Sequence, residues 1–339
     1  MIASHWTPFR RRVESLWPGI LVSGVVAAAA AFLSEHYGAP VMLLALLLGM
    51  SMNFVSAEGR CQAGIEFASR QVLRIGVGLL GLRITFEQVM ALGWQPVLMV
   101  VATVTVTIVV SVAVARAVGF NPLFGLLTGG ATSICGASAA MALSAALPAH
   151  PEKERATAFT VVGVSALSTI AMVLYPMIVK WLDLNDVQAG IFLGGTIHDV
   201  AQVVGAGYSM SPVTGDVATV VKLMRVAMLL PVIVCAAMIA RHGDSQAVAE
   251  GGGKRPPLLP WFAVLFVVLA ALNSAGWVPT LLESSGNELS RWCLVTAISA
   301  LGLKTRLGEL ADVGFKPVAL MLAETVFLAA LVILALRMG

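Results

Sequence analysis

Long apolar stretches, separated by short polar ones, run along almost the whole chain. A helix needs roughly 20 mostly apolar residues to cross ~30 Å of hydrocarbon, and the pattern predicts about ten or eleven such segments. The strands of an outer-membrane barrel would alternate with a period of two over about ten residues, and the sequence has no such alternation. The predicted fold class is therefore an all-α polytopic membrane protein. Its segments are expected near 18–34, 40–56, 63–82, 95–116, 122–147, 157–180, 187–208, 217–240, 258–274, 289–304 and 316–337.

Composition supports lipid as the solvent of this fold. Hydrophobic residues make up 58% of the 339 residues and charged residues only 12%, whereas a soluble domain carries roughly 25% charged residues. Arg10, Arg11 and Arg12 precede the apolar stretch Leu16–Leu33, and no small-residue cleavage site follows it. This arrangement predicts a retained first span with its basic end inside, not a cleavable signal. The four cysteines lack metal-ligand spacing, so neither a metal nor a cofactor is expected.

The polar loops carry a charge asymmetry that predicts orientation. Loops expected on the cytoplasmic side hold Arg60, Arg116, Lys180, Arg241, Lys254, Arg255, Lys304, Arg306 and Lys316. Loops expected on the opposite side hold Glu35, Glu87, Asp216, Glu283 and Glu288, with Arg83 as an exception. The positive-inside rule then predicts a multi-pass protein of a prokaryotic cytoplasmic (inner) membrane, with its N-terminus in the cytoplasm. The net charge of +3 reflects this topology, and no nucleic-acid partner is expected.

We expect one integrated transmembrane domain, with an N-terminal bundle over 1–240, a cytoplasmic linker over 241–257 and C-terminal helices over 258–339. The linker contains Gly251-Gly252-Gly253 and is predicted to be flexible. The charged loop Pro148–Ala156 does not fit this orientation, because a chain with eleven full crossings would place it outside the cell. Re-entrant hairpins at 122–147 and 187–208 would return it to the cytoplasm. The sequence leaves both topologies open.

One sequence pattern occurs twice. The first copy consists of Gly81–Arg83 and Leu92–Val97. The second copy consists of Gly302–Lys304 and Val313–Val318, at identical spacing, and a long apolar helix follows each copy. The span that precedes the first copy is predicted to run outward and the span that precedes the second copy to run inward, as in the inverted repeats of secondary transporters. A simpler interpretation is that Gly-aromatic-x-Pro makes a good interfacial turn. A further pattern, Glu66, Arg70 and Arg74, predicts an internally paired ladder along its helix.

Two segments interrupt the apolar pattern inside predicted spans. In the first, Asn121 is a good N-cap before Pro122, Gly129-Gly130 weakens the helix, and polar residues follow. In the second, Gly194-Gly195 precedes His198-Asp199, a charged pair that is costly inside a membrane. Such breaks aim half-helix N-termini at a bound anion, although GxxxG patterns also serve ordinary helix packing. A mutual salt bridge is the structural alternative for the pair. The paired breaks predict that residues 128–138 and 194–203 meet near the bilayer centre, each with non-helical backbone.

Two cations lie deep in the next helix. If Asp216 caps this helix, Lys222 and Arg225 lie roughly 9 and 13 Å into it and share a face. They call for an anionic partner, which Asp199, Glu324 or a substrate could supply. Glu324 is a lone acid in the last span and a candidate proton carrier.

At these residues the chain resembles the YeiH family of sulfate exporters. The matching stretches are Thr132–Ala139, Gly195–Val203 and Ala218–Arg225, together with Leu73-Arg74 and Gly81–Arg83. The resemblance implies a prokaryotic secondary carrier, similar to the cation:proton antiporter and anion transporter superfamily. It also implies inverted repeats and broken helices around a central site.

We expect a secondary-active transporter, not an enzyme, that exports a small oxyanion (sulfate, sulfite or a sulfonate) by alternating access. Thr132, Ser133, Ser138 and Thr196 are predicted to coordinate the anion, and Lys222 and Arg225 to compensate its charge. Four more residues complete the predicted binding set, namely Cys135, His198, Asp199 and Gln202. Proton coupling is expected at His198 and Asp199, since histidine titrates near neutral pH, with Glu324 as a third candidate.

Three other classes of function fit the sequence less well. A cation:proton antiporter would bind its ion at Asp199. An intramembrane enzyme would use His198-Asp199 with Ser133 or Cys135, but a G-x-S-x-G or HExxH context is missing. A channel would need a charged ring or filter motif, which the sequence does not contain. The expected partners are a small anionic substrate and the lipid bilayer, and the sequence leaves the oligomeric state open, a homodimer included.

Overall fold

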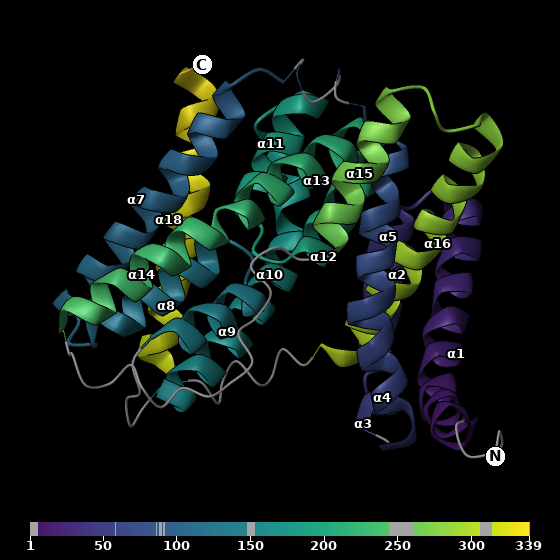
Figure 1. Ribbon diagram of the computed structural model, residues 1–339, viewed down its shortest axis with the longest axis horizontal. Coiled ribbons are helices and arrows are strands. Elements are labelled where there is room, and N and C mark those ends of the chain that lie inside the picture. Colours follow the sequence, from purple (N-terminus) through teal and green to yellow (C-terminus); the bar gives the residue numbers. More distant parts are fainter. Residues whose placement is uncertain are drawn as a thin grey trace. The chain divides into compact units, whose positions relative to one another are not determined.

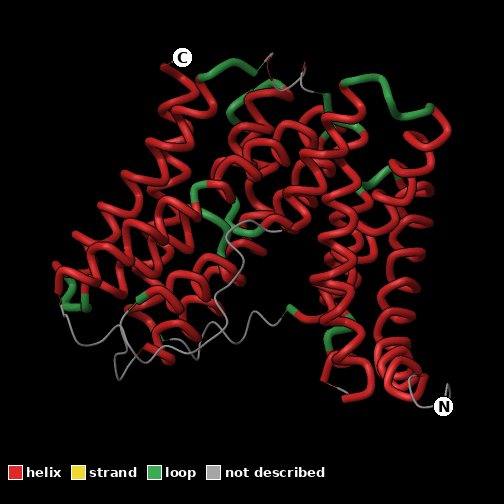
Figure 2. Tube along the Cα trace, viewed as in Figure 1, coloured by secondary structure: helices red, strands yellow, loops and turns green. Residues whose placement is uncertain are grey.

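The computed structural model describes residues 6–57, 59–85, 87, 90, 92–147, 153–243, 261–305 and 314–338. Over these residues the regular secondary structure is helical and contains no strand (Figure 2), as predicted. The chain divides into two compact units, neither contiguous in sequence. The first unit comprises Met1–Ala91, Tyr208–Met210 and Trp261–Arg306, and the second comprises Leu92–Gly207, Ser211–Pro260 and Leu307–Gly339.

The first unit joins the N-terminal helices to two later ones (Figure 1). Its elements are α1 (Trp6–Tyr37), α2 (Val41–Ser51), α3 (Phe54–Ala57), α4 (Gly59–Phe67), the π-helix η1 (Ala68–Val72), α5 (Leu73–Leu79), the 3₁₀ turn η2 (Leu80–Leu82), α15 (Trp261–Ser274) and α16 (Thr280–Lys304).

Glycines bring the helices of the first unit into backbone contact. A Cβ atom on Gly49 of α2 would lie 2.9 Å from the Cα atom of Gly302 in α16, and closer still to the carbonyl oxygen of Ser299. Gly19 of α1 and Gly64 of α4 oppose each other in the same way. Small residues at such crossings are the usual basis of helix association in lipid. The predicted ladder is confirmed for Glu66 and Arg70, which pair at 2.6 Å, and Lys304 of α16 joins them.

The second unit holds the helices that carry the candidate chemistry. They are α7 (Gln95–Ala117), α8 (Pro122–Ser133), α9 (Ala137–Ala146), α10 (Lys153–Trp181), α11 (Asp186–Thr196), α12 (Val200–Met210), α13 (Pro212–Ala227), α14 (Leu229–Gly243) and α18 (Phe315–Met338). The last residues of α12, Tyr208–Met210, group with the first unit.

Helices α8 and α9 form a re-entrant hairpin. Asn121, which precedes α8, and Leu147, which follows α9, line the same cavity. A Cβ atom on Gly130 of α8 would run into the side chain of Leu143 of α9. The two helices therefore lie antiparallel, and the chain leaves α9 at the end where it entered α8.

Helices α11 and α12 form a second hairpin that enters from the opposite end. The hydroxyl of Thr214, just beyond α12, donates to the carbonyl of Asp186 at the start of α11, at 3.1 Å. The 29-residue helix α10 separates the two entry points. Of the two topologies that the sequence left open, the structure contains the one with two hairpins. As a result Lys180, at the far end of α10, lies at the opposite end of the unit from Lys316, and its assignment to the same side was wrong.

Five helices among the described residues are long and apolar enough to cross a membrane. They match predicted segments 18–34, 95–116, 157–180, 217–240 and 316–337, and cover Glu14–Tyr37, Gln95–Ala117, Arg155–Trp181, Pro212–Ala236 and Phe315–Met338. The segments predicted at 40–56 and 258–274 contain the shorter apolar helices α2 and α15. Most of the predicted linker, from residue 244 onward, lies outside the described residues.

The repeated sequence pattern corresponds to repeated structure. Gly93 before α7 and Gly314 before α18 adopt φ angles of +72° and +91°, a region that favours glycine. A Cβ atom on Gly195 would lie 3.5 Å from both Met99 and Val332. Because Met99 is near the start of α7 and Val332 near the end of α18, the two helices run antiparallel, as an inverted repeat requires.

Candidate functional site

Each hairpin has a short non-helical tip. The first tip, Ile134–Gly136, lies between α8 and α9, and Gly136 there has a φ angle of +63°. The second tip, Ile197–Asp199, lies between α11 and α12. Both predicted segments thus contain irregular backbone, but the first tip begins four residues after Gly130 and the second begins two residues after Gly195.

The paired glycines serve packing, which is the alternative that the sequence left open. A Cβ atom on Gly129 would lie 2.8 Å from the hydroxyl of Ser111 in α7. A Cβ atom on Gly194 would lie 3.0 Å from the Cα atom of Ala218 in α13. Breaks at Gly129-Gly130 and Gly194-Gly195 were the wrong prediction, because there these glycines remain helical and let α7 and α13 approach closely.

The two tips meet each other. The Nδ1 atom of His198 lies 2.9 Å from the carbonyl oxygen of Thr132 at the end of α8. A Cβ atom on Gly136 would touch the backbone of His198 at 3.6 Å. We call the region where the two tips meet the crossing. Residues 128–138 and 194–203 therefore come together, as the sequence predicted.

Lys222 of α13 ties the two tips together. It is fully buried, and its ammonium group donates to the carbonyls of Ile134 at 2.7 Å and Ile197 at 2.9 Å, and to that of His198. A lysine has three N–H donors, and all three are used on carbonyls of the tips.

Arg225, one turn further along α13, repeats this arrangement. Its guanidinium donates to the carbonyls of Ser133 at 2.7 Å and Thr132 at 2.9 Å, in the first hairpin. It also donates to the carbonyls of Gly194 and Ile197 in the second hairpin, both at 3.0 Å. The last carbonyls of a helix lack partners within it and carry partial negative charge. The two cations therefore neutralise the C-terminal ends of α8 and α11.

These contacts correct the partners predicted for the two cations. Over the described part of the chain, no ion pair joins Lys222 or Arg225 to Asp199 or Glu324. Their depth is also corrected, because α13 begins at Pro212 with Ser211 as its N-cap, which accepts from the Thr214 amide at 3.0 Å. Lys222 and Arg225 consequently lie about 15 and 20 Å into the helix.

Glu324 of α18 lies in a nest of hydroxyl groups. Thr128 and Thr132 of α8 contact its carboxyl oxygens at 2.7 and 3.1 Å, and Ser111 of α7 makes a third contact. Ser111 has a single hydroxyl hydrogen, yet it also lies 2.7 Å from the carbonyl of Gly125. A protonated Glu324 that donates to Ser111 satisfies every one of these contacts. The geometry therefore suits a neutral carboxylic acid at this position.

His198 is fully buried, and its two ring nitrogens have different partners. Nδ1 must carry a hydrogen, because it faces the carbonyl of Thr132. Nε2 lies 3.0 Å from the hydroxyl of Thr325, which in turn lies 2.7 Å from the carbonyl of Met321. The Thr325 hydroxyl can donate to Nε2 of a neutral imidazole, or accept from Nε2 of a charged one while it donates to Met321. Since Thr325 follows Glu324, one turn of α18 contacts both Thr132 and His198.

The other predicted site residues differ in how open they are. Ser133 and Thr196 are buried and donate to carbonyls of their own helices, at 2.6 Å each. Ser138 is exposed, at the start of α9. Asp199 is partly exposed, accepts from the Ala201 amide at 3.0 Å and so caps α12. Of the predicted hydroxyls, Ser138 is thus the one placed to meet a ligand.

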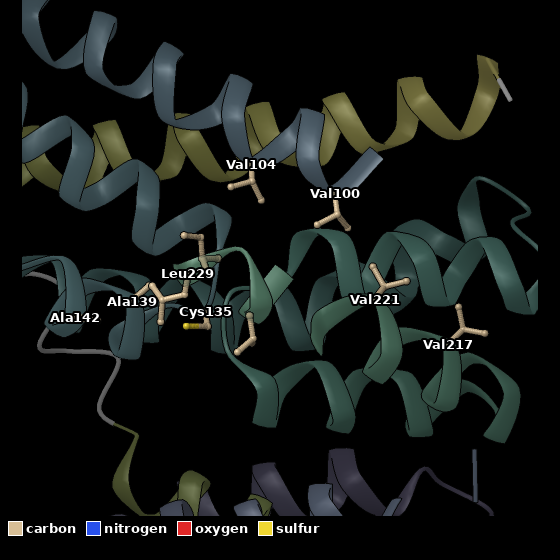
Figure 3. Packing of buried hydrophobic residues seen from close by; sticks show 10 residues of the cluster. Val100, Val104, Cys135, Ala139, Ala142, Val217, Val221 and Leu229 are labelled. Atoms are coloured by element: carbon tan, nitrogen blue, oxygen red, sulfur yellow. The ribbon is translucent and has the colours of Figure 1, made fainter. Parts of the chain in front are cut away.

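Cys135 and Gln202 have contrasting surroundings. Cys135 belongs to an apolar cluster with Val100 and Val104 of α7, which point toward the interior in Figure 3. Gln202 is buried, its Nε2 atom lies 3.4 Å from Thr169, and its Oε1 atom has no partner in the described structure. That oxygen can accept a hydrogen bond from a ligand or from water.

Ser111, Thr128 and Thr325 were missed by the sequence reasoning. A usable signal existed, since Thr103, Thr107 and Ser111 recur every four residues on one face of an apolar helix. Over the described residues, no group of three or more histidine, cysteine or acidic side chains gathers as a metal site would require.

Known proteins are similar to this chain over nearly its full length. The family described as conserved hypothetical protein 698 matches residues 18–321. A UPF0324 membrane protein of Chlorobaculum tepidum is 54% identical over 323 residues, which cover 95% of this chain and 89% of that protein. The UPF0324 membrane protein TauZ of Paracoccus denitrificans is 51% identical over 336 residues, 98% of each chain. The family-level resemblance seen in the sequence is confirmed. The chain therefore belongs to the UPF0324 family of membrane proteins, conserved hypothetical protein 698.

Proposed function

We propose that this protein is a secondary-active transporter that exports a small oxyanion, such as sulfate, sulfite or a sulfonate, across the cytoplasmic membrane. The observation that carries the proposal is the crossing, where two hairpins from opposite ends of one unit meet at their tips. Irregular backbone at such depth is tolerated where protein or a water-filled cavity supplies hydrogen bonds. Each hairpin covers the crossing from one end, which suits a site opened alternately to the two sides.

The anion binds at the start of α9. Helix N-termini attract anions through their free amides and the helix dipole, and α9 begins at Gly136 without a side-chain cap. Ser138 is exposed beside it and adds a hydroxyl donor. Lys222 acts on the anion through its charge, not through contact, because it has no donor left for a ligand. Arg225 adds its charge and has used four of its five N–H donors on carbonyls. The unpartnered Oε1 atom of Gln202 on α12 only accepts hydrogen bonds, so it can contact a protonated oxyanion or water but not a fully ionised anion.

Proton coupling passes through Glu324 and His198. Their shared neighbour is Thr132, whose hydroxyl contacts Glu324 and whose carbonyl contacts His198. Loss of the Glu324 proton leaves a carboxylate that Ser111, Thr128 and Thr132 cannot all satisfy while Ser111 also serves Gly125. Ionisation therefore disturbs the end of α8, next to the tip that binds the anion.

Flux in proteoliposomes tests the binding site. The purified chain should transport radiolabelled sulfate, sulfite or ethanesulfonate when a proton gradient is imposed across the membrane. Ser138→Ala should raise the KM for the anion several-fold, because one of its hydrogen bonds is lost. Ser51→Ala is the matched control, since Ser51 is exposed and bonds only a carbonyl of its own helix, at 2.8 Å. Equal anion kinetics in the Ser138 and Ser51 variants would exclude α9 as the binding element.

A second variant tests the coupling. Glu324→Gln keeps the shape and a hydrogen-bond donor but cannot release a proton. We expect anion exchange without a pH gradient to persist, and the dependence of flux on that gradient to disappear. A flux that still follows the pH gradient would remove Glu324 from the coupling path and leave Asp199 and His198.

Cation:proton antiport is the second candidate, favoured by the partly exposed carboxylate of Asp199 at the crossing. Under that mechanism Asp199→Asn abolishes sodium- or potassium-driven proton movement, and oxyanions have no effect. Under the anion mechanism the same variant keeps oxyanion exchange. Proton movement, recorded with a pH-sensitive dye in the presence of each ion, separates the two.

A further inference from the structure

A cavity of about 350 Å³ opens at the base of the first hairpin, well away from its tip. Residues from four elements line it, among them Asn121 before α8, Leu147 after α9, Lys153 of α10 and Lys316 of α18. The membrane-crossing stretches of α10 and α18 begin at Arg155 and Phe315. The cavity therefore lies at the level where spans enter the lipid, the level of the headgroups.

Three basic side chains line this cavity. They are Lys153, Arg155 and Lys316, and within the described residues none of them pairs with a carboxylate. Lys153 donates to the carbonyl of Leu147 at 2.7 Å, and Arg155 lies over the ring of Phe159 at 5.0 Å. Burial lowers the pKa of Lys153, as expected for an ammonium group that is partly removed from water. None of the described residues that line the cavity is acidic.

Much of the remaining wall is apolar. Phe120, Phe124 and Phe159 contribute aromatic rings, and Leu123 and Leu127, in the first and second turns of α8, extend the wall along that helix. A free inorganic anion would gain nothing from this surface. A molecule with an anionic head and a hydrocarbon tail matches both parts, and basic pockets between membrane helices bind such lipid heads.

We propose that this cavity is a binding site for an anionic phospholipid, with the headgroup phosphate between Lys153, Arg155 and Lys316 and an acyl chain along the phenylalanine wall. The starts of α8, α10 and α18 add favourable helix-dipole charge at the same place, which the end of α9 at Leu147 offsets in part. The lipid would fix the base of the hairpin whose tip forms part of the crossing. The proposal stands independently of any transported substrate.

Lipid binding to the purified, delipidated chain tests the proposal. Phosphatidylglycerol and phosphatidylcholine with identical acyl chains are titrated, and bound lipid is counted by native mass spectrometry. Phosphatidylglycerol should bind at one saturable site and raise the unfolding temperature, whereas phosphatidylcholine should do neither. Arg155→Gln or Lys316→Gln should raise the Kd for phosphatidylglycerol about fivefold, and the double variant about 25-fold.

Matched controls come from the same helix and the same surface. Lys180→Gln removes an exposed lysine from the other end of α10, and Arg116→Gln removes an exposed arginine from the end of α7. Both should leave the Kd unchanged, and Lys316→Arg, which keeps the charge, should retain most of the binding. An unchanged Kd in the double variant, or an equal loss in Lys180→Gln, would overturn the proposal.

A competition experiment distinguishes a site for lipid from a site for a free anion. Glycerol phosphate and sulfate carry the charge without the tails, and they should compete only at concentrations far above that of the lipid. Competition by either one at the same affinity as phosphatidylglycerol would identify a site for soluble anions and would refute the lipid assignment.

Discussion

The two units differ in the polar side chains that they bury between their helices. In the first unit, the buried polar side chains among the described residues are Ser23, Ser69, Ser290 and Ser299, and each donates to a helix carbonyl. In the second unit, Lys222, Arg225, His198 and Glu324 are all buried. Both units use glycines for close backbone contact, and over the described residues the second unit also accepts the cost of ionisable groups in its interior.

That difference indicates where function resides. An ionisable group inside a membrane is expensive and is usually retained for a role beyond packing. Nothing about the crossed hairpins is needed to hold a bundle together, since the first unit does so with continuous close contacts. The buried cations exist because the hairpin tips direct two helix C-termini at one point.

The largest expected effect is the loss of Arg225. Arg225→Gln removes a buried cation and leaves the carbonyls of Thr132, Ser133, Gly194 and Ile197 with fewer donors. We expect the free energy of unfolding to fall by about 3–5 kcal/mol, as when one member of a buried charge network is removed. Arg225→Lys should lose less, because it keeps the charge but not the planar fork. Unfolding in detergent with a denaturant series provides the measurement.

The first unit provides the control for that experiment. Arg70 is 56% exposed and pairs with Glu66 on the surface, so Arg70→Gln should cost less than about 1 kcal/mol. A comparable loss for Arg70→Gln and Arg225→Gln would show that the two units do not differ as described. Full stability in Arg225→Gln would show that the crossing holds without its cation.

A smaller effect is expected from filling a glycine contact in the first unit. Gly49→Ala places a methyl group against the backbone of Ser299 and Gly302, and neither can move aside cheaply. Overpacking of this kind typically costs about 1–3 kcal/mol. Gly24→Ala in α1 is the matched control, because nothing lies within 4 Å of its added Cβ. That change should be neutral or stabilising by up to about 1 kcal/mol, and a loss equal to that of Gly49→Ala would contradict the backbone-contact account.

The sequence predicted much of this architecture, because apolar length and capping residues are local signals. Asn121 was expected to cap a helix, and its side chain accepts from the Leu123 amide at 2.9 Å. The meeting of 128–138 with 194–203 was also expected, although it was argued from breaks at the paired glycines, and the structure places the breaks after those glycines. These inferences needed only the residues themselves and their immediate neighbours.

The partners of the cations were beyond such reasoning. Arg225 bonds carbonyls that lie 92 and 31 residues away in sequence, and every residue has a carbonyl, so no residue type marks them. The glycine pairs were misassigned for a related reason. Whether Gly129 breaks a helix or lets α7 approach depends on Ser111, and the pattern within 122–147 carries no information about that neighbour. Tertiary context decided both points.

The smallest expected effect concerns the surface ion pairs of the first unit. Glu66 is 37% exposed, and its partners Arg70 and Lys304 are 56% and 43% exposed. Water and salt screen such pairs, so Glu66→Gln should change the free energy of unfolding by no more than about 1 kcal/mol. Part of even that change should vanish in high salt, where the Debye length falls to about 3 Å.

A double-mutant cycle of Glu66→Gln with Arg70→Gln isolates the pair from other effects of each change. A second cycle with Lys304→Gln is also informative. Lys304 reaches Glu66 from α16, so the Glu66–Lys304 pair joins two helices that the Glu66–Arg70 pair does not join. If the coupling of Glu66 to Lys304 exceeds that to Arg70 and survives high salt, charge contributes to holding the first unit together, and its contrast with the second unit is one of degree. If both couplings are small and screened, the first unit is held by backbone contact at its glycines, and ionisable groups contribute to internal structure only where the hairpin tips meet.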